Sequence, residues 1–313
     1  MVVVAVIVTS ALAAEGTGAA AVLPPSGKVY AGVTVDGALG TVPELDAYTG
    51  SAGGKRPSVI MDYRDWAHNP NFPTDFADLV AGRGATPLLT WEPWNYGAGV
   101  NQPTYRLSAI ANGTHDALVR RWATQIKAWG KPLMLRFAHE MNGNWYPWSE
   151  GVNGNAAGQY VPAYRRVVSL FRSVGVTNVT WVWSPNVAYP GSVPISRLFP
   201  GDAYVDWTGL DGYNWGTTTE ASGWQSFEQV FGPSITQVRA LSAKPLMLAE
   251  IGSAEQGGDK AAWITDFFAR LAVRPEVRGF LWFNHDKEAD WRVQSSDASR
   301  IAYAAGISAS RYV

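Results

Sequence analysis

Short runs of apolar and β-branched residues recur along the chain at nearly even intervals. Most of these runs are continuous rather than alternating, which is typical of strands that are buried on both faces of a parallel sheet. We therefore predict eight strands, at residues 29–35, 58–63, 86–91, 133–138, 179–183, 205–213, 246–251 and 277–283.

The segments between these strands carry helical patterns, in which apolar residues recur three or four positions apart. The clearest lie at residues 116–129, 160–174 and 260–271. A strand begins about every 35 residues, as in a single (β/α)8 TIM barrel of the α/β class. A doubly wound open sheet is the alternative, but its glycine-rich turn after an early strand is missing.

The N-terminal segment differs from the rest. Residues 2–14 form an apolar run that ends in small residues and is too short to span a bilayer. We read residues 1–14 as a signal peptide, which predicts a secreted protein with no membrane segment after signal removal. A buried strand is the alternative. Residues 15–27 are then expected to be a linker, and residues 28–313 one barrel domain.

The composition excludes several classes of function. The 25 basic and 26 acidic residues leave a net charge of −1, so nucleic acid is not expected as a partner. The chain has no cysteine, and none of its four histidines are spaced for a helix-borne zinc pair. We expect neither a metal nor a cofactor. The 15 tryptophans and 13 tyrosines offer flat apolar faces for a ligand or for the core.

Two carboxylates stand out among the polar residues at the predicted strand ends, where a barrel carries its chemistry. Glu140 follows the fourth strand and Glu250 follows the seventh. Each ends a buried run, where an unpartnered charge is unfavourable. Either one alone could form a structural ion pair, for instance with Arg136. Because the two strands lie on opposite sides of the barrel mouth, both together favour a catalytic pair.

Paired carboxylates beside aromatic residues are what glycoside hydrolysis requires. One acid protonates the leaving oxygen, and the other attacks the sugar or activates water. The motifs of serine hydrolases and of phosphate-binding loops are missing. His139 and Glu140 begin like a zinc-protease helix, but Gly143 stands where the second histidine should be. A non-catalytic carbohydrate-binding barrel is the alternative from another class.

The run Arg-Phe-Ala-His-Glu-Met-Asn-Gly-Asn-Trp-Tyr-Pro-Trp at residues 136–148 resembles the acid/base signature of glycoside hydrolase family 26. The resemblance continues through the segments at residues 181–186, 210–215, 249–253 and 287–292. It implies a (β/α)8 barrel without a cofactor that hydrolyses glycosides with retention. By this resemblance Glu140 is the acid/base and Glu250 is the nucleophile.

The resemblance also implies a set of substrate-binding residues. His139 matches a histidine that contacts the sugar, and Tyr213 a tyrosine that hydrogen-bonds the nucleophile. Arg136 lies four residues before Glu140, so in a strand it shares that face and can hold the nucleophile ionised. Three tryptophans match the floor and walls of the cleft, with core packing as the alternative for each: Trp282 as the floor, and Trp91 and Trp145 as walls.

The segment after the acid bears on the substrate. Mannanases of the family carry a more aromatic run that ends in Trp-Gly, whereas Trp148 is followed here by Ser149. This form is similar to members that act on mixed-linkage β-1,3-1,4-glucan. We therefore expect a monomeric, retaining endo-β-glycanase whose partner is a polysaccharide, with mixed-linkage glucan as the favoured substrate. An endo-β-1,4-mannanase is the alternative within the family.

Overall fold

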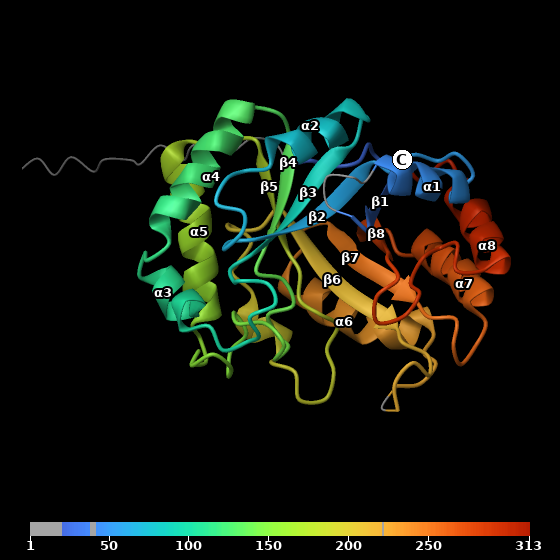
Figure 1. Ribbon diagram of the computed structural model, residues 1–313. Coiled ribbons are helices and arrows are strands. Elements are labelled where there is room, and N and C mark those ends of the chain that lie inside the picture. Colours follow the sequence, from blue (N-terminus) through green and yellow to red (C-terminus); the bar gives the residue numbers. More distant parts are fainter. Residues whose placement is uncertain (1–20, 38–41, 221) are drawn as a thin grey trace, which may run out of the picture.

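A computed structural model describes residues 21–313 except 38–41 and 221 (Figure 1). The predicted signal peptide and the first part of the expected linker lie outside the described residues. Eight parallel strands follow one another in chain order around a closed barrel, and the last pairs with the first. This confirms the single (β/α)8 TIM barrel. The strands are β1 (Tyr30–Val35), β2 (Val59–Asp65), β3 (Thr86–Glu92), β4 (Leu133–Phe137), β5 (Val179–Trp183), β6 (Trp207–Asn214), β7 (Leu246–Ser253) and β8 (Val277–Asn284).

Helices surround the barrel, with α4 and α5 on one side and α7 and α8 on the opposite side (Figure 1). The helices are α1 (Val42–Ser51), α2 (Thr74–Gly82), α3 (Leu107–Ala111), α4 (Asp116–Trp129), α5 (Tyr160–Val174), α6 (Phe227–Leu241), α7 (Lys260–Ala272) and α8 (Asp297–Ile307), with short 3-10 turns η1 (Pro103–Tyr105) and η2 (Ile195–Leu198). All three predicted helices are confirmed as α4, α5 and α7. None of the described helices combines the length and the apolar composition needed to cross a membrane.

The apolar core has two layers, which the alternation of side chains along each strand keeps apart. The inner layer fills the barrel with residues such as Leu88, Met134 and Leu281. The outer layer lies between the strands and the helices. Because alternate residues face opposite layers, only every second residue of a strand can reach the barrel interior and its open end.

The start of the described chain packs against the end of the barrel at which the strands begin. The Val22 amide donates to the Thr180 hydroxyl at 2.9 Å, and the Val22 carbonyl accepts from the Trp207 indole at 2.9 Å. The Arg278 guanidinium donates to the carbonyls of Pro24 and Pro25, each at 3.2 Å. The prediction of a linker up to residue 27 is therefore wrong for residues 22–25, because these residues close the floor of the barrel.

Candidate active site

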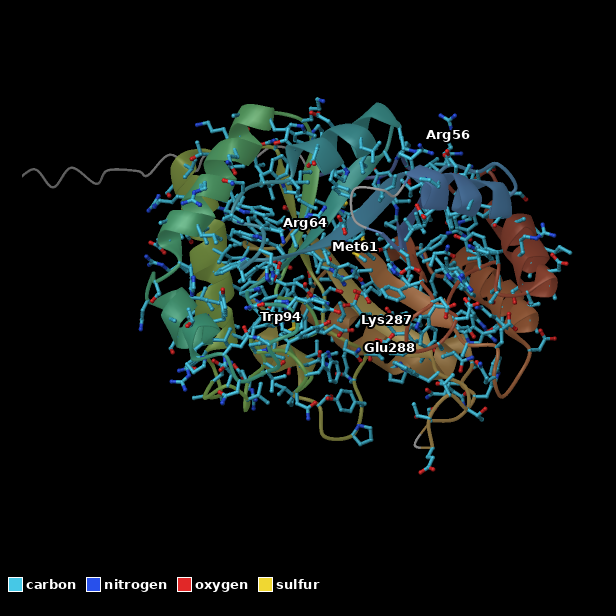
Figure 2. All side chains as sticks on the ribbon, in the orientation of Figure 1. Arg56, Met61, Arg64, Trp94, Lys287 and Glu288 are labelled. Carbon is cyan, nitrogen blue, oxygen red and sulfur yellow. The ribbon has the colours of Figure 1, made fainter. Side chains whose placement is uncertain are left out.

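A cleft with a volume of about 1020 Å³ opens where the strands end, as expected for a barrel of this kind. Trp94, Lys287 and Glu288, which line it, lie at the lower end of the barrel in Figure 2. Carboxyl groups and aromatic rings dominate the lining. They include Asp65, Glu92, Glu140, Glu250 and Glu288, and the rings of Tyr63, Trp94, Tyr96, Trp145, Tyr146, Tyr189, Tyr213, Trp215, Phe283 and Trp291.

Glu140 follows β4 on a strained stretch of backbone. Ala138 and Glu140 have φ angles of 48° and 51°, in the left-handed region that residues other than glycine rarely adopt. Two backbone hydrogen bonds hold the stretch, from the Ala138 amide to Trp91 at 3.1 Å and from the Glu140 amide to Ser184 at 2.8 Å. Such strain costs about 1–3 kcal/mol at each residue and persists where neighbouring structure enforces it. Here it places the Glu140 side chain at the cleft.

The Glu140 carboxyl has two hydrogen-bond donors and no cationic partner among the described residues. The Asn186 amide donates to Oε1 at 2.9 Å, and the Trp145 indole donates to Oε2 at 2.8 Å. Burial and the nearby charge of Glu250 raise the pKa of Glu140 to about 7. A carboxyl with this pKa holds a proton near neutral pH and can transfer it to a ligand.

Glu250 reaches the cleft through an irregularity in β7. Leu210 of β6 pairs with Leu248, but the next residue, Asp211, pairs with Glu250, so Ala249 is an extra residue. Bulges of this kind change the direction of a side chain and recur beside active sites. Here Ala249 lies in the inner core, and Glu250 follows it into the barrel mouth.

Three groups hold the Glu250 carboxyl. The Tyr63 hydroxyl donates to Oε1 at 2.7 Å, the Tyr213 hydroxyl donates to Oε2, and the Arg136 guanidinium forms an ion pair with Oε1. Burial and the charge of Glu250 raise the pKa of both phenols well above their ordinary value, so both stay protonated and donate. The contacts expected for Arg136 and Tyr213 are present.

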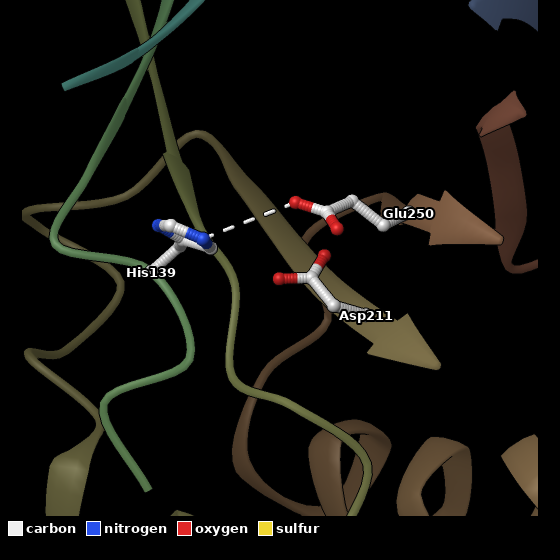
Figure 3. Close-up of side chains that lie close together, drawn as sticks. All are labelled: His139, Asp211 and Glu250. Carbon is white, nitrogen blue, oxygen red and sulfur yellow. Dashed lines mark ion pairs between the residues drawn. The ribbon is translucent and has the colours of Figure 1, made fainter. Parts of the chain in front are cut away.

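Arg136 is fully buried and also binds a second carboxylate. Its Nη1 lies 2.8 Å from both oxygens of Asp211, and its Nε donates to the Thr90 hydroxyl at 2.9 Å. Figure 3 shows Asp211 and Glu250 beside His139. Donor atoms of these three residues lie within 4.8 Å of one another, a spacing that would suit a metal ion. In this structure the Arg136 guanidinium forms ion pairs with both of these carboxylates.

His139 lies below the surface of the cleft. Its Nε2 is 3.9 Å from Oε1 of Glu250 (Figure 3), and its ring packs 4.8 Å from the ring of Tyr146. The side chain is 1% exposed and does not line the cleft. The imidazole therefore lies behind the cleft surface in this structure, packed against Tyr146, and the predicted sugar contact stays a prediction. Burial and Arg136 hold the pKa of His139 well below its ordinary value, so the ring is neutral.

Trp145 is the one predicted tryptophan that lines the cleft. It is 38% exposed and stacks on Tyr189, with ring centroids 5.8 Å apart and planes inclined by 27°. Its indole nitrogen binds Glu140, so the same side chain offers an apolar face and positions a carboxyl. This placement agrees with the predicted cleft wall.

Trp91 and Trp282 lie elsewhere, and their predicted roles as wall and floor are wrong. Trp91 stacks on Trp122 of α4 with ring centroids 4.7 Å apart. Trp282 packs against Tyr303 of α8 and Phe267 of α7. Both are fully buried in the layer between strands and helices. The reason is that side chains alternate between the two faces of a strand, so the adjacent residues Glu92 and Phe283 face the barrel interior instead.

Four functional candidates were missed by the sequence analysis. Tyr63 and Asn186 donate to the two carboxyl groups, and Glu92 and Phe283 line the cleft. Glu92 and Phe283 lie next to the two wrongly chosen tryptophans. Counting inward positions from Leu88 or Leu281 would have selected them, because both leucines belong to the inner layer.

Known proteins resemble this chain in sequence and in fold. It is 37% identical over 290 residues to Endoglucanase H of Acetivibrio thermocellus, a match that covers 90% of this chain and 31% of that protein. It is 25% identical over 263 residues to Beta-1,3-xylanase TXYA of a Vibrio species, covering 77% of this chain and 55% of that protein. The chain thus spans about a third to about half of these relatives.

A solved structure supports the fold. A Cellulomonas fimi endo-beta-1,4-mannanase double mutant superposes with a TM-score of 0.66 at 20% identity, covering 91% of this chain and 72% of that one. The model of Glycosyl hydrolase family 26 matches residues 85–264, more than half of the chain, which include β3 to β7 with Glu140 and Glu250. The chain therefore belongs to glycosyl hydrolase family 26.

Proposed function

We propose that the protein is a retaining endo-β-glycanase in which Glu140 is the acid/base and Glu250 is the nucleophile. The observation that carries this proposal is the contrast between two buried carboxyl groups in one cleft. Glu140 has neutral donors and a pKa raised to about 7, whereas Glu250 is bound by the Arg136 cation. A pair with one proton donor and one carboxylate is what double displacement requires.

The reaction follows from these positions. In the first step Glu250 attacks the anomeric carbon, while Glu140 gives its proton to the glycosidic oxygen and the bond to the leaving sugar breaks. Tyr63, Tyr213 and Arg136 hold the attacking carboxylate in place. In the second step Glu140 takes a proton from water, the water oxygen attacks the anomeric carbon, and the bond to Glu250 breaks. The product keeps the β configuration because the carbon is inverted twice.

A non-catalytic carbohydrate-binding barrel is disfavoured by the same geometry. Sugar binding alone would not require a strained backbone that places a carboxyl without a cationic partner in the same cleft as a second buried carboxylate. Such an arrangement reduces stability, and it becomes useful when charge develops during a reaction.

For the substrate we propose mixed-linkage β-1,3-1,4-glucan. Two observations support a glucan: the resemblance of residues 145–148 to glucanases, and the match to Endoglucanase H over 90% of this chain. An endo-β-1,4-mannanase is the second candidate. Glucose and mannose differ in the orientation of the hydroxyl at C2, and a site built for one geometry leaves polar groups unpaired with the other.

Initial rates on barley β-glucan, glucomannan, galactomannan and β-1,3-xylan test this proposal. The fastest release of reducing sugar is expected from barley β-glucan, with a β anomer as the first product by NMR. Faster release from galactomannan would make the protein a mannanase, and activity confined to the xylan would contradict both candidates. An α anomer as first product would contradict retention.

The pH dependence follows from the proton on Glu140. Because Glu140 must be protonated in the first step, kcat/KM is expected to fall as the pH rises through about 7. The Asn186 hydrogen bond lowers this pKa by stabilising the charged form. Asn186→Ala should therefore move the alkaline limb of a pH–rate profile to higher pH. A limb that stays in place or moves to lower pH would contradict this assignment.

The two kinds of tryptophan should respond differently to removal. Trp145→Ala is expected to lower kcat/KM on polysaccharide by about 10-fold or more through lost stacking, with little effect on stability. Trp282→Ala should lower the free energy of unfolding by about 3–5 kcal/mol, because it leaves a cavity in the outer core. Denaturant unfolding and initial rates on both variants provide the measurement. A stability loss confined to Trp145→Ala would reverse the two assignments.

A further inference from the structure

Glu92 is a third carboxyl in the cleft, and the mechanism proposed above does not use it. It ends β3 and is 5% exposed, yet it lines the cleft. Along β3 it lies two residues after Thr90, which binds Arg136, so both face the barrel interior. Glu92 therefore lies closer to the open end of the barrel than Thr90, which binds the Arg136 side chain. It lies on the side of the cleft formed by β2 and β3.

The contacts of Glu92 leave one of its oxygens available. Oε2 accepts a long hydrogen bond of 3.3 Å from the Trp94 indole. In the part of the chain that the structure describes, no group donates to Oε1 and no cation pairs with this carboxyl. Oε1 is nevertheless not fully buried, so a ligand in the cleft can reach it.

A structural role does not account for these contacts. Burying a carboxyl with a single weak hydrogen bond reduces stability, and a fold that needed only a filled position could use an apolar residue. Glu150 offers a comparison, because this buried carboxyl pairs with Arg197 and accepts hydrogen bonds from two backbone amides. Glu92 has none of these partners and faces the space where a ligand would lie.

We propose that Glu92 is a substrate-binding residue whose carboxyl binds a hydroxyl group of a sugar unit beside β3. The inference rests on the proposed glycanase function and extends it to a third carboxyl. Trp94 and Tyr146 border the same region with aromatic rings 5.3 Å apart, so a sugar there would meet apolar faces as well as the carboxyl. This combination suits a pyranose, which has an apolar face and a rim of hydroxyl groups.

The protonation of Glu92 agrees with this role. Burial raises its pKa to about 8, with further increases from Glu250 on β7 and Asp65 on β2 and opposing effects of Trp94 and Arg136. The phenol of Tyr146, from the loop after β4, is a further titratable neighbour. Below this pH the carboxyl is neutral and can both donate to and accept from a hydroxyl. Above it the donor is lost.

Binding can be separated from catalysis by working in a Glu140→Gln background, which keeps Glu250 in place. Calorimetry with a mixed-linkage glucan oligosaccharide at pH 6 should show affinity about 10- to 100-fold weaker when Glu92→Ala is added. Adding Glu92→Gln should preserve binding within a few fold, because an amide can also donate and accept. Affinity should fall as the pH rises above 8 with Glu92 present and stay constant with Glu92→Gln.

Stability measurements and the unsubstituted enzyme complete the test. Glu276→Gln, at the opposite end of the barrel and paired with Arg274, is the matched control and should change neither binding nor activity. Equal affinity with and without Glu92→Ala overturns the inference while leaving the proposed function intact. A Glu92→Ala variant with a lower melting temperature but unchanged affinity would also overturn the inference and leave the proposed function intact. No hydrolysis of any glycan by the unsubstituted enzyme overturns the proposed function, and this inference with it.

Discussion

Replacing Glu250 with alanine is expected to lower activity on polysaccharide by about 10⁴- to 10⁶-fold, the range seen when a nucleophile is removed from other hydrolases. Without this carboxylate no covalent glycosyl-enzyme forms. Arg136 keeps its ion pair with Asp211 in the variant, so the loss should not come from an unpaired buried cation. The melting temperature is therefore expected to change little compared with the activity.

Azide distinguishes loss of the nucleophile from general damage. It can enter the space left by the Glu250 side chain and attack an aryl glycoside with a good leaving group from the same face. Because only one inversion then occurs, the product should be an α-glycosyl azide, identified by NMR. Glu250→Gln keeps the shape of the side chain and should be as inactive on polysaccharide. A β-glycosyl azide from Glu250→Ala would show that Glu250 is the acid/base instead.

The order of the strands was predictable because a parallel barrel leaves a simple signal. Each of the eight strands is buried on both faces, so each reads as an apolar run, and all eight were found. Only α4, α5 and α7 were predicted by residue range, and α1, α2, α3, α6 and α8 were not. The clearest cases are α1 and α3. α1 has only two buried side chains, Leu45 and Tyr48, and α3 spans only five residues. A helix with so few core contacts carries a weak periodic pattern.

The presence of Glu140 and Glu250 in the cleft was predictable from their positions at strand ends. The alternation of side chains along the strands, which decides where their neighbours point, was not used in the prediction. Trp91 and Glu92 are adjacent, and a strand sends them to opposite faces. Trp91 was assigned to the cleft, but Glu92 is the residue that faces the barrel interior. The aromatic lining comes instead from Tyr63, Tyr213 and Phe283 on the strands and from loop residues such as Trp145 and Trp215.

Two features of the site could not be deduced from the sequence pattern. The left-handed backbone at Ala138 and Glu140 occurs in residues that disfavour it, so composition gives no sign of it. The bulge at Ala249 breaks the alternation of β7, so counting alternate residues from Met247 would turn Glu250 away from the cleft. Both features cost conformational energy locally, and tertiary contacts maintain them. They direct into the cleft the two carboxyl groups that the proposed mechanism uses.

Removing the side chain of Glu140 should affect the two steps of the reaction differently. Glu140→Ala is expected to lower activity on polysaccharide by about 10²- to 10⁴-fold, because the leaving sugar no longer receives a proton. A dinitrophenyl glycoside leaves without one, so its first step should continue with Glu250 and its three partners in place. The second step lacks its base, and the glycosyl-enzyme should accumulate. Stopped-flow measurement is therefore expected to show a burst of dinitrophenol followed by slow turnover.

Azide again gives the decisive comparison, since this anion attacks the glycosyl-enzyme without a base. With Glu140→Ala it should restore turnover of the dinitrophenyl glycoside and yield a β-glycosyl azide, because two inversions occur. Asn186→Ala is the matched variant: it removes a hydrogen bond to Glu140 but leaves the carboxyl, so it should show neither the burst nor azide rescue. An α-glycosyl azide from Glu140→Ala, or equal losses on polysaccharide and on the activated glycoside, would contradict the acid/base role of Glu140.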